Sequence, residues 1–224
     1  MNIRNLLLDF DGTMADSSVG IHRSFCKACF AIGREPPGLD EFKRKIGPPV
    51  EKLSLQFFPE LTSDEICLFR TIFRKEYDSE DYVYLTWAEG IRDTLEKLKF
   101  ELDLKLCVVS NKPTLTCRSL LAKANLSDFF DSIVGIDYLC VNGLGSAFKC
   151  KSHAINHVVA TLKLKPCETF YVGDTYDDYV QATVAGISFI AAQFGFYTWQ
   201  HQSLPISSIP DFPSLVNCVH HVNQ

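Results

Sequence analysis

Residues 6–13 read Leu-Leu-Leu-Asp-Phe-Asp-Gly-Thr, and this stretch decides which fold the chain can adopt. The run from Ile3 to Asp9 predicts a short strand that is buried on both faces, because a strand with one wet face would alternate apolar and polar residues. Two acidic residues, Asp9 and Asp11, stand at its end, and Gly12 then allows the chain to turn. We therefore expect a central strand of a parallel sheet that carries two carboxylates at its carboxyl end.

Further short apolar runs follow along the chain, and most of them end in polar residues or glycine. These runs lie at residues 104–109, 132–135, 169–172 and 187–191. Patterns typical of amphipathic helices lie between them; one of these helices has Ile155 and Val158 on one face, and we expect Ser152 to cap it. The alternation of strand and helix predicts an α/β fold, with a Rossmann-like parallel sheet covered by helices on both faces.

The segment between about residues 16 and 86 breaks this alternation. Apolar residues recur in it at helical spacing, and Thr62-Ser63-Asp64-Glu65 is typical of a capping box at the start of a helix. We predict no buried strand there. The sequence therefore indicates two domains: a core made of residues 1–15 and 87–224, and an inserted all-helical domain made of residues 16–86.

The composition narrows the class of function. The chain has 224 residues, of which 46% are hydrophobic, so it is long enough to bury a sizeable core. Its net charge of −5 argues against a nucleic-acid-binding surface. No apolar run approaches the roughly 18 residues of a membrane-spanning helix. The nine cysteines show no zinc-binding spacing, which predicts reduced thiols and a cytoplasmic location.

Polar residues gather where the predicted strands end. The carboxyl ends of parallel strands meet at one edge of the sheet, and open α/β sheets bind their ligands at that edge. Element order alone therefore predicts that several charged and polar residues converge there. In chain order these residues are Asp9, Asp11, Ser110, Lys149, Lys151, Asp174, Asp177 and Asp178.

This set of side chains suits phosphate chemistry. Clustered carboxylates need raised pKa values or a cation, and oxygen ligands without paired His or Cys favour Mg²⁺. A lysine and a serine hydroxyl beside that cation suit a phosphate group. One carboxylate could attack the phosphorus and form an aspartyl-phosphate, and a second could protonate the leaving group. A calcium loop does not fit, because Leu7 and Ser18 would occupy its first and last ligand positions.

As an ordered set, these motifs resemble those of the haloacid dehalogenase-like (HAD) hydrolase superfamily. Residues 9–13, Asp-Phe-Asp-Gly-Thr, resemble the first motif of that family. Residues 108–112, Val-Val-Ser-Asn-Lys, resemble the second, and residues 173–178, Gly-Asp-Thr-Tyr-Asp-Asp, are similar to the fourth. The helical insert resembles the cap domain of the family, whose residues set the substrate. The resemblance spans nearly the whole chain and is strongest to the phosphoglycolate phosphatase-like branch.

The resemblance implies a role for each acidic residue. Asp9 would be the nucleophile and a ligand of Mg²⁺. Asp11 would be the general acid and base, and would also offer its backbone carbonyl to the metal. Asp174 would be a metal ligand. Asp178 matches the second acid of the fourth motif and would be a further metal ligand, with Asp177 as the alternative.

The resemblance also implies which residues bind the phosphoryl group. Ser110 and a lysine of the third motif would contact it during catalysis. Lys151 matches a variant of that motif in which isoleucine follows four residues later, and Lys149 is the alternative, since the usual proline after the lysine is missing. Gly12 and Thr13 would shape the loop that binds the phosphate, and Asn111 would contact either the phosphate or the cap domain.

The predicted function is a Mg²⁺-dependent phosphatase that hydrolyses a small phosphomonoester of the phosphoglycolate type through an aspartyl-phosphate intermediate. Dehalogenases and phosphonate hydrolases of the superfamily lack the acid that Asp11 provides here, which favours phosphate esters. Two alternatives stay open: a β-phosphoglucomutase-like phosphotransferase, and a non-catalytic protein that binds a phosphorylated ligand. The expected partner is a small phosphorylated metabolite rather than nucleic acid or a membrane, and the sequence leaves the oligomeric state open.

Overall fold

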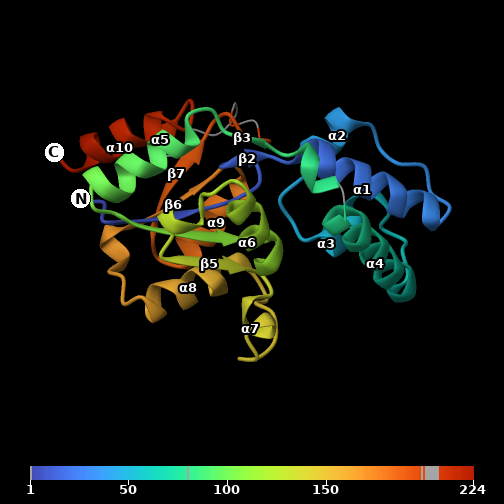
Figure 1. The fold of residues 1–224 in the computed structure, drawn as a ribbon. Helices are drawn as coiled ribbons and strands as arrows, with labels where there is room; N and C mark the ends of the chain where they lie inside the picture. Colours follow the sequence, from blue (N-terminus) through green and yellow to red (C-terminus); the bar gives the residue numbers. More distant parts are fainter. Residues whose placement is uncertain (1, 80, 198, 200–206) are drawn as a thin grey trace. The chain divides into compact units, whose positions relative to one another are not determined.

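The computed structural model describes residues 2–79, 81–197, 199 and 207–224, and the chain divides into two compact units (Figure 1). The larger unit comprises residues 1–15 and 87–224, and the smaller unit comprises residues 16–86. The expected division into a catalytic core and an inserted cap domain stays a prediction.

The larger unit is built on a six-stranded sheet with the strand order β5-β4-β1-β6-β7-β8. The described strand pairs are all parallel. The strands are β1 (Asn5–Leu8), β4 (Lys105–Ser110), β5 (Ser132–Gly135), β6 (Thr169–Gly173), β7 (Ser188–Ala192) and β8 (Ser207–Ile209). All four residues of β1 are buried, and β1 lies between β4 and β6. The predicted Rossmann-like parallel sheet with β1 in its interior is thus confirmed.

The register of the central strands brings their carboxyl ends to one edge. Leu8, the last residue of β1, is paired with Val108 of β4 and with Val172 of β6. The chain continues from these positions into Asp9, Ser110 and Asp174. Three neighbouring strands therefore deliver polar side chains to the same edge, because parallel strands share their direction.

Helices cover both faces of this sheet (Figure 1). They are α5 (Ile91–Glu96), α6 (Thr114–Lys123), α8 (Lys151–Thr161), α9 (Tyr176–Val184) and α10 (Ser214–Val222), with a π-helical turn, Lys97–Glu101, after α5. The short helix α7 (Tyr138–Val141) lies on a segment that projects away from the sheet (Figure 1). On one face, α8 packs against β4 and β5, and α9 packs against β6 and β7. Ile155 and Val158 of α8 join Leu7 and Tyr171 in one apolar core on that face. Figure 1 shows α5 and α10 on the opposite side of the sheet.

The smaller unit is helical, as predicted. Its helices are α1 (Ser18–Ala31), α2 (Leu39–Lys43), α3 (Val50–Phe57) and α4 (Ser63–Ser79), followed by a 3-10 turn, Asp81–Tyr84. Its core is aromatic: the ring centroid of Phe25 lies 4.7 Å from that of Phe42 and 4.8 Å from that of Phe69. The predicted capping box of α4 is confirmed, since the Thr62 and Glu65 amides each bond to the other residue's side chain.

Two short strands, β2 (Ala15–Asp16) and β3 (Thr86–Trp87), pair where the chain leaves the larger unit and returns to it.

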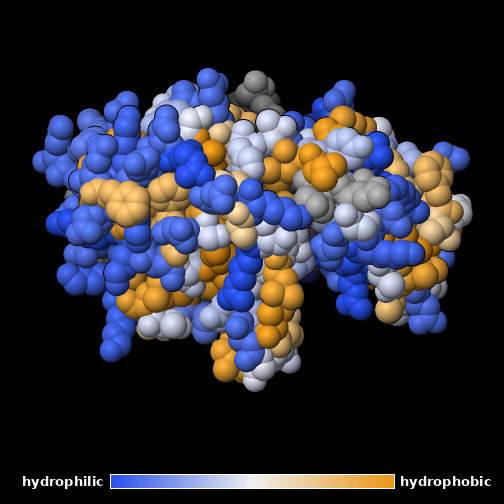
Figure 2. Space-filling view, in the orientation of Figure 1, coloured by the Kyte–Doolittle hydropathy of each residue, from blue (hydrophilic) through white to orange (hydrophobic). Residues whose placement is uncertain are grey.

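Figure 2 shows that the surface over α5 and α10 is mostly hydrophilic. Apolar side chains gather on the projecting segment that carries α7, where Val141 and Leu144 are exposed (Figure 2). In the described part of the chain, no helix combines the length and apolarity that crossing a membrane requires.

The structure corrects the expected start of α8. Ser152 does not cap this helix; the helix begins at Lys151, and Cys150, two residues before Ser152, occupies the cap position without a side-chain cap bond. Ser152 is instead buried in the first turn, and its amide donates a hydrogen bond to Gln181 Oε1.

β8 and α10 had no counterpart in the sequence prediction, so the sheet extends one strand further than expected.

Candidate active site

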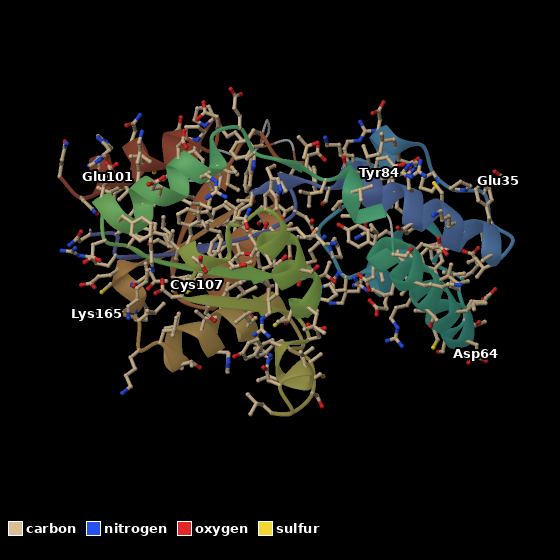
Figure 3. All side chains as sticks on the ribbon, in the orientation of Figure 1. Glu35, Asp64, Tyr84, Glu101, Cys107 and Lys165 are labelled. Atoms are coloured by element: carbon tan, nitrogen blue, oxygen red, sulfur yellow. The ribbon has the colours of Figure 1, made fainter. Side chains whose placement is uncertain are left out.

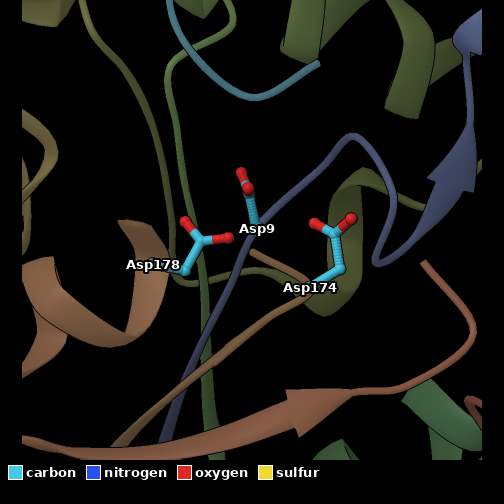
Figure 4. A group of neighbouring side chains, drawn as sticks. All are labelled: Asp9, Asp174 and Asp178. Atoms are coloured by element: carbon cyan, nitrogen blue, oxygen red, sulfur yellow. The ribbon is translucent and has the colours of Figure 1, made fainter. Parts of the chain in front are cut away.

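Three buried carboxylates lie together beyond the carboxyl ends of β1 and β6. Asp9 follows β1, Asp174 follows β6, and Asp178 lies in the first turn of α9. One oxygen from each residue lies within 4.8 Å of the others, and Figure 4 shows the three groups next to one another. None of the three residues is more than 5% exposed. Such a group is stable only if positive charge or protons compensate the carboxylates.

Lys151 provides part of this positive charge. It is the first residue of α8 and is only 3% exposed. Its Nζ donates to Asp9 Oδ2 at 2.8 Å and also to Asp178 Oδ1. Burial alone would lower the pKa of Lys151, but the carboxylates of Asp178 and Asp9 outweigh this effect and raise the pKa well above its usual value. Lys149, the alternative left open by the sequence, is exposed.

The carboxylate of Asp9 is fixed by several donors. Lys151 binds Oδ2, the backbone N–H of Phe10 donates to Oδ1 at 2.8 Å, and the Ser110 hydroxyl bonds to the same carboxyl group. Burial raises the pKa of Asp9 to about 6, although the ammonium group of Lys151 works in the opposite direction. At pH 7 the side chain is therefore mostly ionised and held in one orientation, as a nucleophile requires.

The two oxygens of Asp174 differ in their contacts. Oδ2 accepts the backbone N–H of Phe196 at 2.7 Å, whereas Oδ1 is buried and has no hydrogen-bond partner among the described residues. Burial raises the pKa of Asp174 well above its usual value, and the carboxylates of Asp178 and Asp9 add to the effect. A bound cation would satisfy this buried oxygen and stabilise the ionised form.

Asp178 belongs to a capping box that begins α9. The Thr175 hydroxyl accepts the Asp178 N–H, while Asp178 Oδ2 accepts the Thr175 N–H at 3.0 Å and its hydroxyl at 2.7 Å. This arrangement leaves Oδ1 for Lys151. Asp177, the other acid left open by the sequence, is exposed and accepts a bond from Gln181 instead. The structure thus brings Asp178, and not Asp177, into the buried acidic group.

The three acids fit a Mg²⁺ ion. Their donor atoms are carboxylate oxygens, which Mg²⁺ prefers, and the uncompensated oxygen of Asp174 faces no other described donor. Asp9, Asp174 and Asp178 could therefore hold the ion.

Asp11 forms an ion pair of its own. Lys112 Nζ lies 2.8 Å from Asp11 Oδ1 and 3.1 Å from Oδ2, and the Lys112 side chain is only 4% exposed. Sequence reasoning placed Lys112 in the second motif but gave it no role. The two residues are 101 positions apart, so no local spacing could have revealed their contact.

Two glycines let the chain approach Asp174 closely. A Cβ atom at Gly12 would lie 2.2 Å from Asp174 Oδ2, and one at Gly195 would lie 2.1 Å from Asp174 Cβ. Gly12 also has a φ of 77°, which favours glycine. Gly12 was expected to shape a phosphate-binding loop; the structure gives it a further task, which is to leave room for Asp174.

The two remaining candidates are Thr13, which follows Gly12, and Asn111. Thr13 is fully buried, and its hydroxyl has no hydrogen-bond partner within the described part of the chain. Asn111 is half-buried and directly follows Ser110 at the end of β4. The expected roles of both residues in phosphate binding stay predictions.

Comparison with known proteins shows which proteins the chain is similar to in sequence. The sequence model of the family described as haloacid dehalogenase-like hydrolase matches residues 6–192. The phosphoglycolate phosphatase of Aquifex aeolicus (strain VF5) is 32% identical over 213 residues, which cover 94% of this chain and 91% of that protein. The phosphoglycolate phosphatase of Rhodobacter capsulatus is 27% identical over 211 residues, which cover 92% and 89% of the two chains.

A solved structure has a similar fold. A haloacid dehalogenase-like family hydrolase from Streptococcus pneumoniae superposes with a TM-score of 0.82 at 26% identity, covering 97% of this chain and 98% of that one. Sequence and structure therefore match over nearly the whole length. The chain belongs to the haloacid dehalogenase-like hydrolase family.

Proposed function

We propose that the protein is a phosphatase that hydrolyses a small phosphomonoester with the help of Mg²⁺, and that phosphoglycolate is the first substrate to test. The family match and the phosphoglycolate phosphatases among its relatives support phosphoric monoester hydrolysis. One observation carries the proposal: Asp9 is held by Lys151 and Ser110, and it lies beside Asp174 and Asp178. This arrangement joins a nucleophile to groups that bind a phosphoryl group and a cation.

The proposed reaction has two displacements at phosphorus. In the first, the Asp9 carboxylate attacks the phosphorus, the bond to the ester oxygen breaks, and Asp11 gives its proton to the departing alkoxide. In the second, Asp11 takes a proton from water while the water oxygen attacks the aspartyl-phosphate. Phosphate leaves, and the carboxylate of Asp9 is restored. Both steps need acid–base help from one carboxyl group in turn, which Asp11 would provide.

Charge on the phosphoryl oxygens must be offset throughout this reaction. Lys151 stays an ammonium group because its pKa is raised, and together with the Ser110 hydroxyl it would bind two of these oxygens. Mg²⁺, held by Asp9, Asp174, Asp178 and the backbone carbonyl of Asp11, would supply further positive charge. Removing one such partner typically slows an enzyme on the order of 10²- to 10³-fold.

A panel of phosphomonoesters, assayed with Mg²⁺ and with a chelator, tests the proposal. We expect turnover of phosphoglycolate that depends on Mg²⁺, and a loss of at least about 10³-fold in Asp9→Asn, which removes the nucleophile. Asp177→Asn, which changes an exposed acid on the same helix as Asp178, should stay within about threefold of the wild type. Activity retained in Asp9→Asn would contradict the mechanism, and conversion of glucose 1-phosphate to glucose 6-phosphate would indicate the phosphotransferase instead.

The cellular setting is a part of the proposal. All nine cysteines are free thiols, which is the state expected in a reducing cytoplasm. We place the enzyme there, with a small phosphorylated metabolite as its substrate.

A further inference from the structure

We propose that Lys112 is a positioning residue, which holds the carboxylate of Asp11 in the orientation that proton transfer to the leaving group requires. This inference rests on the proposed phosphatase reaction and adds a residue to it. Lys112 Nζ contacts both oxygens of Asp11, at 2.8 and 3.1 Å. Contacts to both oxygens hold the carboxylate group in place, because a shift of the group away from Nζ would lengthen at least one of them.

The side chain of Lys112 is itself fixed. It is only 4% exposed, and its Nζ lies 5.4 Å from the ring centroid of Phe10, the residue between the two acids of the first motif. Phe10 is fully buried, and its ring lies 5.5 Å from that of Trp87. A buried ammonium group separated from its carboxylate is strongly destabilised, so the pair with Asp11 is held together.

The backbone that carries Lys112 is fixed as well. Its N–H donates to the Ser110 hydroxyl at 3.2 Å, and the next helix begins with the Thr114 N–H bonded to Asp137 Oδ1 at 2.7 Å. A Cβ atom at Gly135 would lie 2.3 Å from the Lys112 carbonyl oxygen, so β5 packs directly against this turn. Lys112 therefore approaches Asp11 from a rigid support, which is what a positioning residue needs.

The proposed role of Asp11 gives this pair a chemical consequence. A proton donor that is displaced by about 1 Å can lose on the order of 10²-fold in rate. The loss depends on the ester, because p-nitrophenolate is stable as an anion and leaves without a proton, whereas a simple alkoxide does not. In the first displacement, a residue that acts through Asp11 therefore affects alkyl and aryl esters unequally, while a residue that only supports the fold affects both equally.

The test compares kcat/KM for ethyl phosphate, phosphoglycolate and p-nitrophenyl phosphate at saturating Mg²⁺, because kcat/KM reports the steps up to the departure of the leaving group and excludes the later hydrolysis of the aspartyl-phosphate. In Lys112→Met we expect kcat/KM for both alkyl esters to fall about 10- to 100-fold, and kcat/KM for the aryl ester to fall less than about threefold. Lys112→Arg keeps the cation and should recover most of the alkyl activity. Asp11→Asn should show the same dependence on the leaving group, and Lys112→Met combined with Asp11→Asn should be no slower than Asp11→Asn alone.

Lys165→Met is the matched control. Lys165, labelled in Figure 3, is exposed, forms an ion pair with Glu168 at 3.1 Å, and precedes β6 at the edge of the sheet away from the acids. Its loss should leave all three rates unchanged. Lys112→Gln repeats the comparison with a polar group in the buried position, in case Lys112→Met does not fold.

Three outcomes would overturn the inference. An equal loss on alkyl and aryl esters would make Lys112 a structural residue. A loss confined to phosphoglycolate would mean that Lys112 binds the substrate carboxylate rather than positioning Asp11. A wild-type protein that hydrolyses none of the esters would overturn the proposed function itself, and this inference with it.

Discussion

Individual oxygen atoms decide what each carboxylate of the site can do. Asp178 uses Oδ2 for Thr175 and Oδ1 for Lys151, so both of its oxygens already accept hydrogen bonds. Asp174 uses only Oδ2, for the N–H of Phe196, and its Oδ1 has no partner among the described residues. The removal of a cation would therefore leave Asp174 as the least compensated acid of the group.

Gly12→Ala tests how Asp174 is placed. The new Cβ atom would lie 2.2 Å from Asp174 Oδ2, and a φ of 77° would strain the alanine by about 1–2 kcal/mol. Because Asp174 must move, we expect the affinity for Mg²⁺ to fall about 10- to 100-fold. Calorimetric titration with Mg²⁺ measures the affinity, and thermal denaturation measures the stability.

Gly33→Ala is the control for backbone strain. Gly33 has a similar φ of 71°, but no heavy atom of the described residues lies within 4 Å of a Cβ built there. This variant should lose about 1–2 kcal/mol of stability and bind Mg²⁺ like the wild type. If Gly12→Ala and Gly33→Ala bound Mg²⁺ with the same affinity, the position of the Asp174 carboxylate would not depend on Gly12.

At the scale of elements, Asp178 belongs both to the capping box that begins α9 and to the buried acidic group of the site. Thr175→Val removes a hydroxyl that accepts the Asp178 N–H at 3.1 Å and donates to Asp178 Oδ2 at 2.7 Å. We expect a loss of about 1 kcal/mol in stability, since a helix cap is removed, and weaker Mg²⁺ binding, since Asp178 can rotate. Thr175→Ser keeps the hydroxyl and should restore both. If Thr175→Val bound Mg²⁺ as tightly as the wild type, the cap would stabilise the helix without contributing to metal binding.

The smaller unit depends on the aromatic core under α1. Phe25 is fully buried, and its ring lies within 5.5 Å of the rings of Phe42, Phe57 and Phe69. We expect Phe25→Ala to cost about 3–5 kcal/mol in the free energy of unfolding, because the cavity would separate these rings. Phe30→Ala, on the same helix but at a residue 62% exposed, should cost less than about 0.5 kcal/mol. Urea denaturation compares the two, and similar losses would contradict the assigned core.

The elements nearest the site could be predicted from the sequence because each strand is a short buried run. β1, β4 and β6 consist mostly of apolar residues and lead into an acid, a serine or a glycine. Such a run is too short for a buried helix and too apolar for an exposed loop, which leaves a buried strand. β8 escaped prediction because it has only three residues, two of them serine, at the edge of the sheet. Edge strands need less apolar surface, so their pattern is weak.

The contacts within the site could be predicted only in part. Both Lys149 and Lys151 lie close to the expected start of a helix, so local pattern does not distinguish them. What distinguishes them is that Lys151 is buried between Asp9 and Asp178, which is a tertiary property. The expected cap at Ser152 failed because Lys151 itself begins the helix. The ion pair between Lys112 and Asp11 was missed for a similar reason. It forms because the turn after β4 lies beside the turn after β1, and this is a tertiary contact between residues 101 positions apart.

For the whole molecule, the balance of charge in the site links folding to metal binding. Four carboxylates, those of Asp9, Asp11, Asp174 and Asp178, face two ammonium groups, those of Lys112 and Lys151. When all are ionised, the site keeps a formal charge of −2, which one Mg²⁺ ion would neutralise. Without metal, the protein can reduce this charge only by keeping a proton on an acid.

We therefore expect the metal-free protein to lose stability as the pH rises from about 4 to 6. The pKa of Asp9 is about 6 in the folded protein, against about 3.9 in an unfolded chain, so the folded state binds the proton more tightly. This contribution is fully present below pH 4 and is lost as the pH passes 6; it amounts to roughly 2–3 kcal/mol. The raised pKa of Asp174 acts in the same direction. Urea denaturation at several pH values with a chelator measures the change.

Saturating Mg²⁺ should remove most of this loss, because the metal binds the ionised acids and only the folded chain brings them together. Other groups also titrate, and Asp16 is one of them. Partial burial raises its pKa, but the hydrogen bonds from Lys43 and Ser18 outweigh this effect and hold the pKa below its usual value. Asp16 therefore contributes stability that is lost on acidification. The difference between the wild type and Asp9→Asn cancels such contributions, because only Asp9 is changed. If the two proteins lost stability equally between pH 4 and 6 without metal, the proton on Asp9 would not be the cause.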